Sequence, residues 1–171
     1  MRSRRELLSA LGVSGVGSLI AIRVGRAEAE SARSAPATVG VGDSSDTPAP
    51  IERFEATPAR PGIPRISYAT RHGDVVYLAG ITAAPQRLGD VKEQTRDVLA
   101  RIDDLLAAAG TDKSRLLTAQ VWLTDMKLFA DHNDAWNEWV DPRNAPVRAC
   151  LLSPQLWRPG MLVEIMVTAA R

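Results

Sequence analysis

The clearest pattern in this chain is an alternation of apolar residues near its C-terminus, over residues 161–169. Successive side chains of a β-strand point to opposite faces, so a period of two predicts a half-buried strand. The face expected to meet the core carries Val163, Ile165, Val167 and Ala169. The opposite face carries Leu162, Glu164, Met166 and Thr168.

Four further segments have the β-branched and aliphatic residues that are typical of strands: 66–71, 75–79, 115–123 and 146–152. The first two are separated by His72-Gly73-Asp74, which is the composition of a tight turn. In the last of them, Arg148, Cys150 and Leu152 share one face.

Helical spacing appears in two other segments, residues 91–109 and 126–139. Apolar residues of the first recur on one stripe, with Asp90 as the expected N-cap and Gly110 just past its end. The second is expected to be capped by Thr124-Asp125 and stopped by Asp141-Pro142.

The resulting order, β-β-α-β-α-β-β, predicts an α+β open sandwich with two helices on one face of a mixed sheet. The other face is then exposed, and we expect it to carry the apolar residues Cys150, Leu152, Leu162 and Met166. An exposed apolar sheet face indicates an interaction surface, so the pattern predicts a homo-oligomer.

The N-terminal region has a different character from residues 51–171, which form the predicted domain. Residues 1–29 resemble a twin-arginine-type signal peptide: Arg4-Arg5, a mildly apolar middle, and an Ala27-Glu28-Ala29 cleavage site. Residues 30–50 are rich in Ser, Ala, Thr, Pro and Gly, which predicts a disordered linker. We therefore expect export to the periplasm or the exterior, without stable membrane association after cleavage; the alternative is a cytoplasmic protein.

Charge and composition exclude several kinds of site. The 21 basic and 20 acidic residues of the chain become 16 and 18 once residues 1–29 are removed, which gives no electrostatic case for binding nucleic acid. The single cysteine forms no internal disulfide, and the two histidines lack the spacing of metal ligands.

Two charged residues, Arg148 and Glu164, stand among apolar neighbours in the last two strands. Unpaired buried charge is costly, so each is expected to have a partner or a function. One interpretation is a structural ion pair between them. The other is a site in which Arg148 binds a substrate carboxylate and Glu164 handles a water molecule.

Several segments together resemble the RidA/YjgF family of reactive-intermediate (enamine/imine) deaminases. The resemblance covers residues 63–170 and rests on 67–69, 73–80, 94–96, 105–110, 121–126, 129–133 and on Pro146-Val147-Arg148-Ala149-Cys150 with Val163-Glu164-Ile165.

This resemblance implies a chorismate-mutase-like fold and a homotrimer with clefts between subunits. It implies cofactor-free hydrolysis of enamine/imine acids to 2-keto acids and ammonia. Arg148 would bind the substrate carboxylate and Glu164 would position or activate the attacking water. Gly80, Asn133 and Cys150 would complete the substrate site.

The chain departs from the family pattern at Ile66, where well-known members carry Tyr, and at Ile81, where Gln is common. These changes predict an altered pocket around the substrate side chain. A second hypothesis is therefore a non-catalytic trimeric module that binds a small carboxylate. Release of ammonia and keto acid from an imine distinguishes the two.

Overall fold

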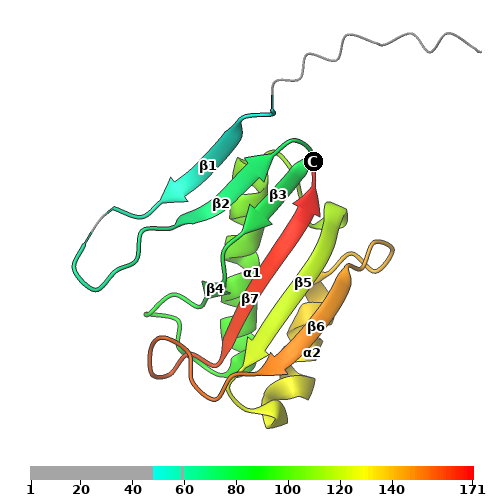
Figure 1. Ribbon diagram of the computed structural model, residues 1–171. Coiled ribbons are helices and arrows are strands. Elements are labelled where there is room, and N and C mark those ends of the chain that lie inside the picture. The colour runs from blue at the N-terminus through cyan, green and yellow to red at the C-terminus, as the bar shows by residue number, and fades with distance from the viewer. Residues whose placement is uncertain (1–47, 59) are drawn as a thin grey trace, which may run out of the picture. The chain divides into compact units, whose positions relative to one another are not determined.

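The computed structural model describes residues 48–58 and 60–171, which contain one mixed β-sheet and two α-helices. The strands are β1 (Ile51–Ala56), β2 (Ser67–His72), β3 (Val75–Leu78), β4 (Ile81–Thr82), β5 (Leu116–Leu123), β6 (Val147–Leu152) and β7 (Val163–Ala170). The helices are α1 (Val91–Ala108) and α2 (Phe129–Trp139), with short 3-10 turns at Lys113–Arg115 and Met126–Leu128. Figure 1 shows the strand order β1-β2-β3-β7-β5-β6, with β4 also paired to β7.

Strand β7 is the centre of the sheet because it pairs with β3, β4 and β5. Its predicted apolar face is confirmed, since Val163, Ile165, Val167 and Ala169 are all at most 1% exposed. The strand pairs are antiparallel except β5 with β6, which run parallel. Strand β6 therefore lies at an edge of the sheet, paired only with β5.

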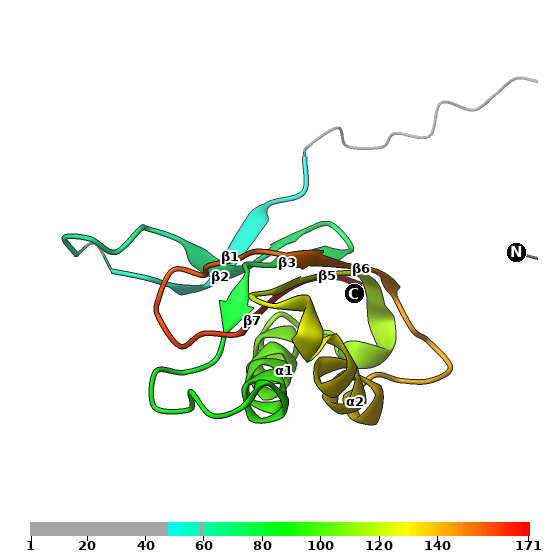
Figure 2. The ribbon, with the colours of Figure 1, turned by 90° about the horizontal axis from the view of Figure 1, so that it is seen from below.

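Both helices pack against the same face of the sheet, as Figure 2 shows. This confirms the predicted α+β open sandwich with two helices on one face. The helix face of the sheet and the inner stripes of the helices form a single core, which includes Val98, Ile102 and Leu106 of α1. The other face, which no helix covers, is called the open face below.

The residues expected to cap α1 do so in the structure. The Asp90 side chain accepts a hydrogen bond from the Glu93 backbone N–H, and the Glu93 side chain accepts one from the Asp90 N–H, which makes a capping box. Gly110 follows the helix with a φ of +82°, a conformation that glycine adopts without steric cost. Asp125 caps the 3-10 turn that precedes α2, so the α-helix begins three residues later than the predicted start at Met126.

Two strands, β1 and β4, were not predicted. Strand β1 is mostly exposed and mixes charged with apolar residues, and β4 has only two residues, so neither has a hydrophobic period that a sequence pattern reveals. The predicted signal segment, 1–29, lies outside the described residues. So does most of the predicted linker, 30–50, and both stay predictions. Among the residues described, neither helix is long and apolar enough to cross a membrane.

The prediction for the open face was wrong at Cys150. Cys150 is paired with Val121, which is fully buried in the core, so its side chain points to the helix face. The apolar residues that strand β6 does present to the open face are Val147 and Leu151, which are 72% and 49% exposed. Of the other three residues expected there, Met166 lies on this face and Leu162 packs half-buried against the core. The prediction was also wrong at Leu152, which is paired with the buried Leu123 and so lies on the helix side, exposed at the end of β6.

A buried glutamine joins α1 to the loop before β7. Gln94 is fully buried, and its Nε2 donates to the carbonyl oxygens of Gly89, at 3.0 Å, and Gly160, at 2.9 Å. Its Oε1 accepts from the Leu162 backbone N–H at 2.9 Å. Since Leu162 stands two residues before Glu164, Gln94 fixes the start of the strand that carries this carboxyl group.

We predict that Gln94→Leu lowers the free energy of unfolding by roughly 2–5 kcal/mol, because it leaves a buried N–H and two carbonyl groups without partners. Denaturant unfolding of the full chain at one protein concentration measures the change. Arg96→Leu is the control on the same helix: its pair with Glu138 at 3.0 Å is exposed, so its loss should cost less than about 1 kcal/mol. Equal losses in the two variants would contradict the role given to Gln94.

Candidate functional site

Arg148 lies on the helix face of β6, against α2. Its Nη2 donates to Nε2 of His132 at 2.7 Å, and its guanidinium carbon lies 4.9 Å from the centre of the Trp136 ring. His132 and Trp136 are four residues apart on α2, so they stand on one side of the helix. The edge strand and the helix therefore hold the guanidinium between them.

The guanidinium has no anionic partner within the described part of the chain. None of the salt bridges there includes Arg148, and its Nε is buried without a hydrogen-bond partner. Burial lowers the pKa of Arg148, although an arginine stays charged under ordinary conditions. A half-buried cation without a carboxylate is costly, so an anionic ligand would satisfy it.

Asn133, next to His132 on α2, also has an unsatisfied atom. Its Oδ1 is buried without a partner, and Arg148 Nε is the only other such side-chain atom among the described residues. Both residues were predicted as substrate-binding from the sequence. Unsatisfied buried polar atoms are rare in native proteins, which makes this pair a candidate for contact with a ligand.

Cys150 lies two residues beyond Arg148 on the same face of β6. Burial raises the pKa of its thiol, and the positive charge of Arg148 opposes that shift. The thiol is therefore a weak nucleophile at neutral pH. A contribution of Cys150 to ligand binding would then come from its backbone groups, which an edge strand leaves unpaired on its outer side. We call Arg148, Asn133, His132, Trp136 and Cys150 the arginine half-site.

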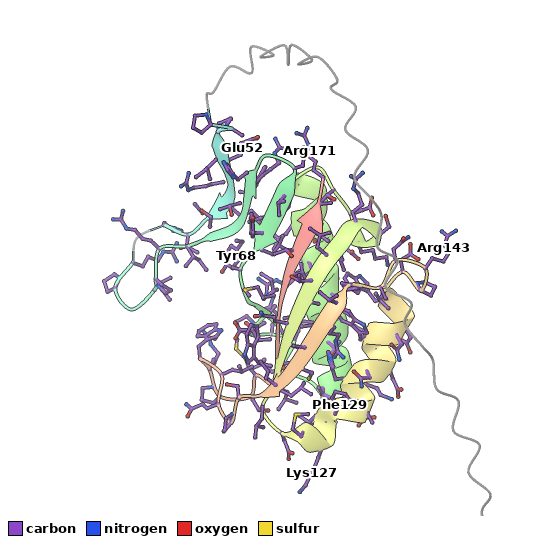
Figure 3. All side chains as sticks on the ribbon, turned by 45° about the vertical axis from the view of Figure 1, so that its right-hand side comes forward. Glu52, Tyr68, Lys127, Phe129, Arg143 and Arg171 are labelled. Carbon is purple, nitrogen blue, oxygen red and sulfur yellow. The ribbon has the colours of Figure 1, made fainter. Side chains whose placement is uncertain are left out.

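Glu164 lies on the open face of the sheet, two strands away from Arg148. It is paired with Trp122 of β5 on one side and Thr82 of β4 on the other. Half-burial raises the pKa of its carboxyl group, and no salt bridge in the described structure includes it. Trp122, the β5 partner of Glu164, lies near the end of that strand. From this end the chain passes through Lys127 and Phe129 into α2 (Figure 3).

Gly80 allows the Glu164 carboxyl group to lie against the backbone. A Cβ atom added at Gly80 would stand 1.9 Å from Glu164 Oε1, so any other residue would displace the carboxyl group. Trp157 covers the neighbouring position, since its indole Nε1 donates to the hydroxyl of Thr82 at 3.3 Å. We call Glu164, Gly80, Thr82, Trp157 and Trp122 the glutamate half-site.

The two half-sites do not meet within one chain. Ala119 is the partner of Arg148 and Trp122 is the partner of Glu164, and these two β5 residues point to opposite faces. Two strand spacings also separate them, roughly 10 Å across the sheet. The alternative of a structural ion pair between Arg148 and Glu164 in one chain is therefore wrong.

Grooves of the single chain lie elsewhere. One of about 620 Å³ is lined by the loop before α1 and the first half of that helix, and one of about 730 Å³ lies between the end of α1 and residues 139–143. Neither contains Arg148 or Glu164. Among the described residues, no group of three His, Cys, Asp or Glu side chains is arranged to hold a metal ion.

Sequence analysis missed His132, Trp136 and Thr95, although all three shape the arginine half-site. The spacing of His132 and Trp136, four residues apart on a predicted helix, indicates that they share one side of that helix. It does not indicate which strand this side faces. The departures at Ile66 and Ile81 have different consequences. Ile81 is 1% exposed in the core, so its side chain does not line the open face, whereas Ile66 is 37% exposed.

His132 should make the stability of the protein depend on pH. Burial, aided by the charge of Arg148, lowers its pKa from 6.5 to about 4. The folded state thus binds fewer protons than the unfolded state between these values, and stability falls as pH drops from about 6.5 through about 4. His132 should account for a loss of roughly 2 kcal/mol between about pH 7 and pH 5.

Denaturant unfolding at the two pH values checks this prediction. His132→Gln should lose about 2 kcal/mol less than the wild type over the interval. His72→Gln, which removes the exposed histidine, serves as the control and should behave like the wild type. An unchanged pH dependence in His132→Gln would refute the depressed pKa.

Residues 57–171 match the family model described as "Endoribonuclease L-PSP". A RutC family protein from Haemophilus ducreyi is 42% identical over 106 residues, which are 62% of this chain and 89% of the relative. The RutC family protein YoaB from Escherichia coli is 40% identical over 100 residues, 58% of this chain and 84% of the relative.

A solved structure of a YjgF family member from Neisseria meningitidis matches with a TM-score of 0.65 and 35% identity. The match covers 73% of this chain and 98% of that one. The family model spans more than half of the chain, and its match includes both half-sites. The chain therefore belongs to the RidA/YjgF family.

Proposed function

We propose that this protein hydrolyses reactive enamine/imine acids to 2-keto acids and ammonia, as a homotrimer whose sites lie between subunits. The observation that carries the proposal is the state of Arg148. Its guanidinium is half-buried, lacks an anionic partner in the described structure, and has a buried Nε without a hydrogen-bond partner. A carboxylate matches this fork of planar donors bidentately.

Asn133 favours a ligand that carries a second polar group next to its carboxylate. Its buried amide has an unsatisfied atom beside the same helix turn that holds Arg148. The unsatisfied Oδ1 only accepts hydrogen bonds, so it suits the N–H of an imine next to a carboxyl carbon. A 2-imino acid presents the N–H and the carboxylate on adjacent carbons.

Glu164 suits the hydrolytic step. Burial raises the pKa of its carboxyl group toward the range in which a general base is effective at neutral pH. In the proposed reaction Glu164 takes a proton from water while the oxygen attacks the imine carbon. The proton then passes to the nitrogen, which gives a carbinolamine. Glu164 next moves the hydroxyl proton of the carbinolamine to its amino group, the C–N bond breaks, and ammonia leaves as the C=O bond of the keto acid forms. Neither a redox change nor an electron carrier is required.

A second copy of the chain would bring the half-sites together. Arg148 and Glu164 point to opposite faces of the sheet, so a ligand that touches both must lie between two subunits. The open face that carries Glu164 also carries exposed apolar residues such as Leu151 and Val147, which association would cover. Both features favour clefts between subunits over a site within one chain.

The surroundings of Glu164 favour substrates with an apolar side chain. Leu151, Trp122 and Glu164 are paired in one row across β6, β5 and β7, and Trp157 stands nearby with 62% of its surface exposed. Aromatic and aliphatic surface next to the reacting carbon favours aliphatic or aromatic 2-imino acids over short charged ones.

The description of the family model suggests ribonuclease activity as another possibility. The balance of 16 basic and 18 acidic residues after removal of 1–29 gives little attraction for a polyanion. His132 is fully buried and engaged with two neighbours, which leaves it unsuited to proton transfer with RNA. The half-sites support the carboxylate function better.

Arg148 and Glu164 should affect different steps. Arg148→Met should weaken binding of 2-oxobutanoate, a product-type keto acid, by more than about tenfold, and Arg148→Lys should restore it only in part. Glu164→Gln should keep keto-acid binding within a few-fold of the wild type but lose most of the hydrolysis. An amino-acid oxidase that generates imines beside the purified protein, with ammonia and keto acid measured over time, gives the hydrolysis rate.

Arg96→Met is the matched control, because it removes an exposed arginine that pairs with Glu138 on the far side of the helices. It should leave both binding and hydrolysis unchanged. Binding by the wild type without release of ammonia beyond the spontaneous rate would favour the non-catalytic carboxylate-binding module. Equal binding by Arg148→Met and wild type would rule out both functions.

We also propose export through the folded-protein route, on the basis of the Arg4-Arg5 motif and the Ala27-Glu28-Ala29 segment. Replacing both Arg4 and Arg5 by Lys should trap the precursor in the cytoplasm, whereas Arg23→Lys and Arg26→Lys should not. Cell fractionation with immunoblotting follows the protein. If the first double variant were exported as efficiently as the wild type, the signal interpretation would be wrong.

A further inference from the structure

His132 connects the two helices to the candidate carboxylate-binding residue. Its side chain is fully buried, with Nδ1 3.0 Å from the hydroxyl oxygen of Thr95 on α1 and Nε2 2.7 Å from Arg148 Nη2 on β6. Thr95 is fully buried as well. The proposed function assigns no role to either residue.

The chemistry of arginine fixes the tautomer of this histidine. A guanidinium has only donors, so Nε2 of His132 must accept the hydrogen bond from Arg148 and carries no proton. The neutral ring then has its proton on Nδ1, which donates to the hydroxyl oxygen of Thr95. Each hydrogen bond in the series Thr95–His132–Arg148 thus has a defined donor and acceptor, and the Thr95 and His132 side chains are fully buried.

These contacts determine which part of Arg148 remains available. His132 accepts a hydrogen bond from Nη2 at one edge, and the guanidinium carbon lies over the Trp136 ring. The Nε has no partner among the described residues but is buried, so a ligand would first meet the exposed part of the half-buried guanidinium. Without His132, the long side chain could rotate and present its donors in several directions, and binding a carboxylate would require ordering it.

We propose that His132, held in one tautomer by Thr95, is a positioning residue that orients the Arg148 guanidinium for a ligand carboxylate. The inference rests on the proposed role of Arg148 in carboxylate binding. It assigns a function to a histidine on α2 that touches no ligand itself. A buried histidine that only fills the core would affect stability and leave ligand binding unchanged.

The first experiment measures the tautomer by ¹⁵N NMR of the labelled full chain, without ligand. The chain has only two histidines, so His72→Gln leaves His132 as the sole imidazole signal. At neutral pH we expect a neutral ring with the proton on Nδ1. A proton on Nε2, or a charged ring, would overturn the inference because Arg148 could not then donate to this atom.

The second experiment compares variants in calorimetric titrations with 2-oxobutanoate. His132→Met fills similar space but offers Arg148 no strong acceptor, and it should weaken binding by about tenfold. His132→Gln places an amide oxygen near the Nε2 position and should bind within about threefold of the wild type. Thr95→Val should weaken binding, and Thr95→Ser should restore it, because only the hydroxyl holds the tautomer.

Steady-state assays supply a readout that a purely structural role would not change. His132→Met should raise KM for the imine much more than it lowers kcat, while thermal melting shows that the variant is folded. Unchanged binding and KM in a folded His132→Met protein would overturn the inference while leaving the proposed function intact. If the wild type itself bound no keto acid, the proposed function would fail, and the positioning role with it.

Discussion

The structure depends above all on the two-residue period of β-strands. Arg148 and Glu164 come from strands separated only by β5, yet their β5 partners, Ala119 and Trp122, point to opposite faces. Arg148 therefore points to the helix layer, and Glu164 points to the open face. Each charge is half-buried and without an opposite charge in the described residues. A single subunit therefore has two unsatisfied charged groups that only another molecule can bring together.

The remainder of the fold holds these groups in place at a cost in stability. Helix α1 fixes α2 through the buried contact between Thr95 and His132, and α2 in turn holds Arg148. Gln94, on the same helix, fixes the chain just before Glu164. Burial lowers the pKa of Arg148 and of His132 and raises the pKa of Glu164. In each case burial disfavours the charged form of the side chain. Such strain is typical of binding and catalytic sites, where function opposes maximal stability.

The sequence predicted the elements whose signals are local, and it failed where the answer depends on packing. The ends of α1 were predicted from Asp90 and Gly110, and the buried face of β7 from its strict alternation. The face of β6 could not be predicted, because an edge strand with a charged residue on one side and Val147 and Leu151 on the other gives no clear period. The contact of Arg148 with His132 joins residues 16 positions apart, and only the packing of α2 on the sheet reveals it. Family resemblance pointed to Arg148, Asn133 and Glu164 and to clefts between subunits, but it did not indicate that Arg148 and Glu164 lie on opposite faces of the sheet.

The most direct test of this account is activity in mixed oligomers of Arg148→Met and Glu164→Gln chains. The two variants, differently tagged, are co-expressed and the mixed species is purified, with light scattering to confirm a trimer. If each site takes its arginine from one subunit and its glutamate from the next, every mixed trimer contains one intact site of three. The purified mixed trimers should therefore show about a third of wild-type imine hydrolysis. Each variant alone should be nearly inactive. Mixed trimers as inactive as the single variants would show that Arg148 and Glu164 do not act together across a subunit boundary. A stable monomer would contradict the proposal that the site lies between subunits.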